Sequence, residues 1–158
     1  MLFRSGNRHY EAKAQNAMGD AHAALQRWDY AREQYARAAE TFAAMSMGLG
    51  ETEADAGLAR VALAVGDHSM ALRKVQAILE RSDKSQEWHT AFAVRLTCWR
   101  ALTACGDARA DAVLASAQAD LHAAAAKIRD PLLRASFLDN VASHRAILAA
   151  GQGRPGEA

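Results

Sequence analysis

Three charged residues, Asp20, Arg60 and Arg100, recur in this chain at intervals of forty positions. A guanidinium group presents its N–H donors in a planar fork, so an arginine can hold a carboxylate through two parallel hydrogen bonds. If positions forty apart form one row, Arg60 and Arg100 would bind the carboxylates of an acidic segment or of a chain terminus. The simpler interpretation is that each arginine is solvated or pairs with a nearby acid.

Other polar residues fall beside this row on the expected helices. Asn16 stands four residues before Asp20, and both would face the same groove. The remaining and weaker candidates for contact with a partner are Lys13, Glu53, Asn140 and His144.

Catalytic motifs do not occur in the sequence. It contains no glycine-rich phosphate loop, no His-Glu-x-x-His pair and no serine in a nucleophile elbow. The six histidines never stand four apart. A phosphotransfer role would need one exposed histidine on a helical bundle, with His122 or His144 as candidates, but the internal repeat argues against it. We therefore expect no enzyme activity, no cofactor and no metal site.

Charge and hydropathy limit the classes of partner. The 19 basic and 18 acidic residues are dispersed and give a formal charge of +1, which does not favour nucleic acid or a membrane surface. No apolar run approaches the length of a membrane span, and residues 1–10 carry charges in place of an apolar signal core. Cys98 and Cys105 lie seven apart on one expected helix, too far for a disulfide. We expect a cytoplasmic protein with reduced cysteines.

Composition predicts that helices position all of these residues. Alanine supplies 39 of the 158 residues and proline only two, which is typical of an all-α protein. Gly66-Asp67 recurs forty residues later as Gly106-Asp107, and Trp28, His68 and Ala108 stand at matching places after each turn. Repetition at such a period indicates stacked helical hairpins.

The hydrophobic spacing predicts about seven helices. We expect units at residues 8–47, 52–81 and 85–128, a capping helix over 130–150 and a flexible tail over 151–158, all in a single domain of residues 1–150. The expected helices are Arg8–Gln26, Trp28–Met47, Thr52–Val65, a fourth ending near Arg81, Trp88–Cys105, Ala108–Ile128 and one from Pro131 to Ala150. Their capping residues are Thr52, Asp67 or Ser69, one of Ser82, Asp83 and Ser85, and Asp130; Gly48 ends the second helix.

Apolar stripes predict which faces of these helices pack. The first helix carries one stripe of Tyr10, Ala14, Met18, Ala21 and Leu25, and the third carries Leu58, Ala62 and Val65 as its inner stripe. The last helix should close the array, with Leu132 or Leu133, Phe137, Val141 and Ile147 or Leu148 on the third unit. The first hairpin has no such cover. We expect its outer face to form a homodimer or to pack against preceding sequence.

The first unit resembles the tetratricopeptide repeat (TPR) family. The resemblance rests on Met18-Gly19, Trp28, Ala31, Tyr35 and Ala38, with a weaker copy in Leu58-Ala59, Gly66, Ala71 and Ile78 and a third at Gly106. The period of forty exceeds the usual thirty-four of the family. The chain is therefore similar to the long-repeat variety of the family, which is found in bacterial signalling and regulatory proteins.

The resemblance implies an α-solenoid of about three hairpins plus a capping helix. It also implies a scaffold that binds a peptide or helix of a protein partner in a concave groove lined by the first helix of each unit. The alternative is a regulatory segment of a larger signalling or transcription protein, which would bind a small ligand or self-associate.

Overall fold

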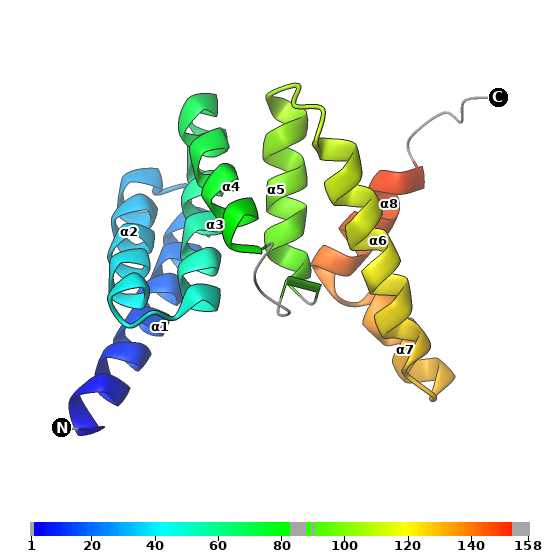
Figure 1. Cartoon of the computed structure of the whole chain (residues 1–158), viewed down its shortest axis with the longest axis horizontal. Coiled ribbons are helices and arrows are strands. Elements are labelled where there is room, and N and C mark those ends of the chain that lie inside the picture. Colours follow the sequence, from blue (N-terminus) through cyan, green and yellow to red (C-terminus); the bar gives the residue numbers. More distant parts are fainter. Residues whose placement is uncertain (1, 83–87, 90, 153–158) are drawn as a thin grey trace. The chain divides into compact units, whose positions relative to one another are not determined.

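The computed structural model describes residues 2–82, 88–89 and 91–152, with side chains from Asn7 to Gly151 within those ranges. All regular secondary structure in these ranges is helical, which confirms the all-α prediction (Figure 1). The chain divides into two compact units, Met1–Ser85 and Gln86–Ala158. Within the described ranges, no helix is both long enough and apolar enough to cross a bilayer.

Unit 1 contains two helical hairpins. Its helices are α1 (Leu2–Ala24), α2 (Trp28–Ala44), α3 (Gly48–Ala64) and α4 (His68–Ser82). Each packs on the next along the chain, and α1 also contacts α3. Two apolar clusters join α1 to α3, one around Phe42 and one around Tyr35. Stacking consecutive hairpins in this way is the arrangement of an α-solenoid.

One type of turn ends α1, α2, α3 and α5. A residue in the left-handed region follows each of these helices: Gln26 at φ 56°, Ser46 at 55°, Gly66 at 78° and Gly106 at 66°. The next backbone N–H then donates to a carbonyl five residues earlier, as from Asp67 to Ala62 at 2.8 Å and from Asp107 to Leu102 at 2.9 Å. This is the Schellman arrangement, which satisfies carbonyls left open at a helix end. The repeated Gly-Asp pairs, Gly66-Asp67 and Gly106-Asp107, form two of these four turns.

The boundary between α2 and α3 lies earlier than the sequence predicts. Gly48 does not end the second helix; α2 stops at Ala44 and Gly48 begins α3. The predicted cap Thr52 is instead buried within α3. The turn is made by Ser46 in the left-handed conformation, so Gly48 is free to begin the next helix. Gly50 serves packing, because a β-carbon there would lie 2.5 Å from Cδ1 of Phe42.

Unit 2 contains α5 (Phe92–Ala104), α6 (Ala110–Ala126), α7 (Pro131–Asp139) and α8 (Ala142–Gln152). Its core joins α5, α6 and α8 through Phe92, Leu96, Leu114, Ala117, Leu121 and Ile147. Burial raises the pKa of the Cys98 thiol to about 12, and Cys105 is half-buried, both without a disulfide. Of the predicted caps before α5, Ser82 belongs to α4, whereas Asp83 and Ser85 lie outside the described residues.

The predicted capping helix is two helices. Asp130 caps α7 as expected, accepting from the backbone N–H groups of Leu132 and Leu133, but α7 ends at Asp139. Arg145 donates to the carbonyl of Asp139 and His144 contacts that of Phe137, so side chains of α8 satisfy carbonyls at the break. The described residues therefore form eight helices, where about seven were expected.

The break also changes which residues close unit 2. Phe137, Ile147 and Leu148 pack on the α5–α6 core, as predicted. Leu132 and Leu133 do not, because they are 81% and 63% exposed, and Val141 is exposed at the break itself. A short α7 places these three side chains away from the core that α8 covers.

Candidate partner-binding surfaces in unit 1

The α1–α3 face brings together Asp20 and Arg60, two of the three charged residues that recur at intervals of forty. The Arg60 guanidinium donates to Asp20 Oδ1 at 2.8 Å, which joins α3 to α1. Tyr35, from α2, donates its hydroxyl to the same oxygen at 2.5 Å and accepts from Arg60 at 3.1 Å. The Arg60 guanidinium carbon lies 5.7 Å from the centre of the Tyr35 ring, which adds a cation–π contact. Two members of the row, Asp20 and Arg60, therefore form a closed network with Tyr35.

Three further predicted residues lie on the same two helices. Desolvation raises the pKa of Glu53, and the Asp20 charge adds to that shift while Lys13 opposes it. Asn16 is half-buried, and its buried Oδ1 has no hydrogen-bond partner within the described residues. One polar face of unit 1, which we call the α1–α3 face, therefore contains Lys13, Asn16, Asp20, Glu53 and Arg60.

The other predicted residues lie elsewhere. Arg100 is exposed on α5 in unit 2, so its pairing with Arg60 around a carboxylate stays a prediction. Asn140 caps the end of α7 and donates from Nδ2 to Ser136 Oγ at 3.0 Å, which is a structural role. His144 is buried between the rings of Phe92 and Phe137. Of the predicted arginines, Arg60 already donates to Asp20, so a carboxylate of a partner would have to compete with Asp20 for this guanidinium.

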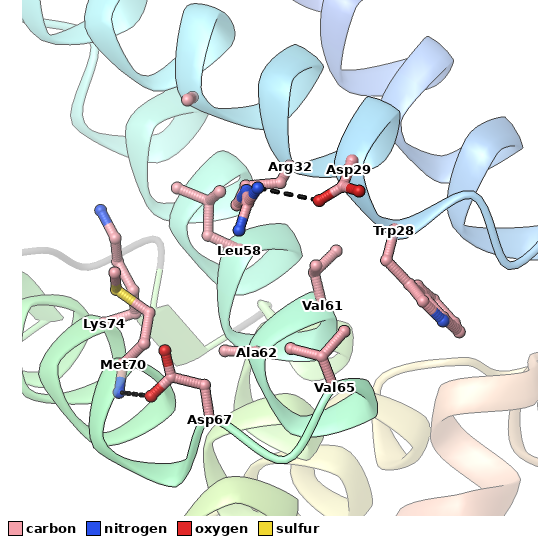
Figure 2. A pocket seen from close by; sticks show the side chains of 11 residues that line it. Trp28, Asp29, Arg32, Leu58, Val61, Ala62, Val65, Asp67, Met70 and Lys74 are labelled. Atoms are coloured by element: carbon pink, nitrogen blue, oxygen red, sulfur yellow. Dashed lines mark hydrogen bonds and ion pairs between the residues drawn. The ribbon is translucent and has the colours of Figure 1, made fainter.

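An apolar cavity of about 290 Å³ opens on another side of unit 1 (Figure 2). Helix α3 forms its floor, and α2 and α4 supply its flanks. The lining residues are Trp28, Asp29, Arg32, Ala36, Leu58, Val61, Ala62, Val65, Asp67, Met70 and Lys74. We call this cavity the α2–α4 groove.

The sequence of α3 explains why the α2–α4 groove is open. Leu58, Val61 and Val65 recur at intervals of three and four, so they share one face of the helix. Leu58 and Val61 are buried against α2, but Val65, at the end of α3, is 53% exposed. The small side chains of Ala36 and Ala62 leave the space unfilled. The stripe that spacing predicted as core is therefore partly a surface.

Every charged side chain on the rim already has an intramolecular partner. Arg32 donates to Asp29 at 2.8 Å. Asp67 caps α4 by accepting from the backbone N–H of Met70 and from Ser69, and these bonds lower its pKa. Lys74 donates to the buried carboxylate of Asp55 at 2.8 Å. The groove therefore offers apolar surface and no unpaired charge.

Unit 2 holds a separate charged cluster, which is structural. The fully buried Arg95 donates to Asp120 at 2.7 Å and to Ser116 at 2.7 Å. Trp88 lies with its ring centre 5.4 Å from the Arg95 guanidinium carbon, and His89 contacts Asp120 at 3.0 Å. These bonds tie the turn at residues 88–89 to α5 and α6.

Comparison with known proteins does not extend this description. No protein-family model matches the chain, and no curated protein or solved structure matches it. Sequence reasoning found the α1–α3 face through its forty-residue row. It missed the α2–α4 groove, although the alternation of small and large residues along α3 was the available signal.

Proposed function

We propose that this chain is a TPR-like protein–protein interaction scaffold of the kind used in bacterial signalling and regulation. Unit 1 binds a helical or extended segment of a protein partner, which inserts a large apolar side chain into the α2–α4 groove. The observation that carries this proposal is an open apolar cavity on a stack of helical hairpins, at the surface of α3. Grooves of this kind receive the apolar face of an amphipathic helix.

The chemistry of the groove favours an apolar anchor over a small polar ligand. Pockets for small molecules combine an apolar wall with a few converging polar groups that orient the ligand. Here Asp29, Arg32, Asp67 and Lys74 are all used within the chain. A polar ligand would have to break these bonds, whereas an apolar side chain gains from leaving water.

The lining of the groove suits a peptide. Trp28 from α2 and Met70 from α4 are among the lining residues, and Figure 2 draws them on opposite sides of α3. Tryptophan is common among residues that dominate binding energy, and methionine adapts its shape to different partners. The rim charges of both signs are exposed or half-buried around this apolar centre, as at many interfaces.

A selection experiment tests this proposal. A displayed library of amphipathic peptides would be selected on the wild-type chain, and binding of the selected peptides measured by fluorescence anisotropy. We expect the peptides to share one bulky apolar residue. Val65→Glu places a charge in the groove at an exposed position and should weaken binding at least about tenfold, which corresponds to roughly 1.4 kcal/mol.

Leu49→Glu is the matched control, because Leu49 is also an exposed apolar residue of α3 and does not line the groove. It should leave the affinity within about twofold. Equal binding to wild type and Val65→Glu would overturn the groove as the site. Peptides that lose binding only with Arg60→Glu would place the site on the α1–α3 face instead.

A further inference from the structure

Helix α1 turns an apolar face to solvent. Tyr10 is 71% exposed, Met18 48% and Leu25 62%. Ala14, Ala17 and Ala21 lie between them and are also exposed. The backbone N–H of Leu25 donates to Ala21, so the helical turn continues to Leu25. We call these six residues the α1 stripe. Apart from the adjacent Ala17 and Met18, successive members are three or four residues apart, so the six form one continuous band.

The opposite face of α1 is the one that unit 1 uses. Ala12 and Gly19 are buried there, and Gly19 lies against the ring of Tyr35. Beside them, His9, Gln15, Asn16 and His22 each bury a nitrogen or oxygen that has no hydrogen-bond partner within the described residues. The most apolar face of α1 is therefore left uncovered while a more polar face packs. Contiguous exposed apolar surface of this kind marks an interaction site.

The order of residues along the α1 stripe is symmetric. About a point between Ala17 and Met18, Ala14 corresponds to Ala21 and Tyr10 corresponds to Leu25. The three alanines lie toward the middle of the stripe, and the large side chains of Tyr10 and Leu25 lie at its two ends. A two-fold axis through this point would make the stripe complementary to itself, as a symmetric dimer interface requires.

We propose that two copies of the chain form a dimer by packing their α1 helices antiparallel across this two-fold axis. Tyr10 packs on Leu25 of the second copy, Ala14 on Ala21, and Ala17 on Met18. The alanines allow the two helix axes to approach closely, Met18 packs beside the two-fold axis, and Tyr10 and Leu25 fill the ends of the contact. The dimer uses a face distinct from the α2–α4 groove, so each dimer presents two grooves.

The charges beside the stripe support a second copy as the occupant. In an antiparallel pair, each flank of a helix faces the same flank of its partner. Lys13 and Asp20 share one flank and are seven residues apart, so each Lys13 would face Asp20 of the other copy. The Asp20 carboxylate bonds to Arg60 and Tyr35 within its own chain, but it is 64% exposed and can accept from a further donor. This flank therefore brings together groups of opposite charge.

The length of the contact predicts a modest affinity. From Tyr10 to Leu25 the helix rises about 22 Å, and a single helix pair of this length falls among the smaller protein interfaces. We therefore expect a reversible dimer with a dissociation constant on the order of micromolar.

Sedimentation velocity over a concentration series tests the dimer directly. The wild-type chain should shift from monomer to dimer as its concentration rises through the micromolar range. Met18→Glu places two carboxylates beside the axis and should leave a monomer at every concentration. Circular dichroism should show an unchanged fold, because Met18 is exposed. A wild-type chain that stays monomeric at the highest concentration, or a Met18→Glu chain that still dimerises, would overturn the proposal.

Two double variants test the antiparallel register. In the chain with Ala14→Glu and Ala21→Lys, each new glutamate faces a new lysine, so the dimer should persist. In the chain with Ala14→Glu and Ala21→Glu, each glutamate faces a glutamate, so the dimer should be lost. If the helices packed parallel, both variants should lose the dimer, because position 14 would face position 14 and position 21 would face position 21, which brings like charges together.

The groove variant separates this inference from the proposed function. Val65→Glu should dimerise like wild type, since Val65 lies outside the α1 stripe, while Met18→Glu should still bind the selected peptides. Loss of the dimer in Val65→Glu would contradict the α1 interface without bearing on peptide binding.

Discussion

Gly57 of α3 lies so close to Tyr35 of α2 that a β-carbon at position 57 would stand 2.5 Å from the ring carbons Cδ1 and Cε1. Gly19 of α1 approaches the same ring, with its β-carbon position 2.6 Å from Cε1. The Tyr35 ring therefore lies between two glycines from two other helices. This close packing brings the Tyr35 hydroxyl to the Asp20–Arg60 ion pair.

Gly57→Ala should destabilise unit 1 by about 1–2 kcal/mol, because the added methyl group must displace the ring by more than alanine gains in helix propensity. Gly48→Ala is the control on the same helix, since nothing lies within 4 Å of its β-carbon position. That change should be neutral or slightly stabilising. Urea unfolding followed by circular dichroism measures both. Equal effects at the two positions would contradict the close contact with Tyr35.

The left-handed turns predict two opposite effects. Gln26→Gly should stabilise the chain by roughly 0.5–1 kcal/mol, because glycine adopts a φ of 56° without the strain of a β-carbon. Gly66→Ala should destabilise it by about 1 kcal/mol, because alanine must then adopt a φ of 78°. Thermal unfolding of both variants checks the signs. A lower midpoint for Gln26→Gly would mean that its side chain contributes a contact that outweighs the strain.

The buried Asp55 carboxylate should contribute more to stability than an exposed one. It accepts from Lys74 and from Arg81, whose side chains are 30% and 28% exposed. Asp55→Asn removes the acid that Lys74 pairs with and leaves Arg81 with Glu51 as its remaining acid. The change should cost about 2 kcal/mol, less than for a fully buried pair because water screens the cations. Asp29→Asn removes an exposed acid from its pair with Arg32 and should change little. Denaturant midpoints for the two variants provide the comparison.

Tyr35 should make stability fall at alkaline pH. Desolvation, together with the hydrogen bond to Asp20, raises the pKa of its phenol from 10 to about 12. The folded chain therefore keeps this proton where the unfolded chain releases it, so the stabilisation is complete below about pH 10 and is lost as pH rises toward 12. Denaturant unfolding at pH 8 and pH 11 should show a larger decline for wild type than for Tyr35→Phe. Parallel declines would exclude Tyr35 as the source.

The local signals in the sequence predicted most helices and turns correctly. Asp130 before Pro131 starts α7, and Gly66 and Gly106 end their helices in the left-handed conformation. Such features depend on residues within one turn of the chain, so no distant contact needs to be known. The error at Gly48 shows the limit of this reasoning, because a serine, Ser46, supplied the left-handed residue.

The candidate surfaces were predicted only in part. The forty-residue row placed Asp20 and Arg60 on a common face, since a repeat puts equivalent positions on neighbouring hairpins. It did not predict that they bond to each other, nor that Tyr35 of α2 donates to the same Asp20 oxygen at 2.5 Å, because both depend on how the three helices pack. Nor did it predict the α2–α4 groove. The spacing places Val65 on the apolar side of its helix, but it does not indicate whether another helix covers that side.

By itself the sequence determined an all-α chain of repeated hairpins, because alanine-rich periodicity and Gly-Asp turns act over short distances. Only the tertiary structure decided which face of α1 packs inward. Its apolar stripe looked suited to a core, but the close fit of Gly19 against Tyr35 turns that stripe to solvent. Burial of a helix face depends on the shape of the neighbouring helix as well as on its own hydrophobicity, and that shape exists only once the hairpins have packed.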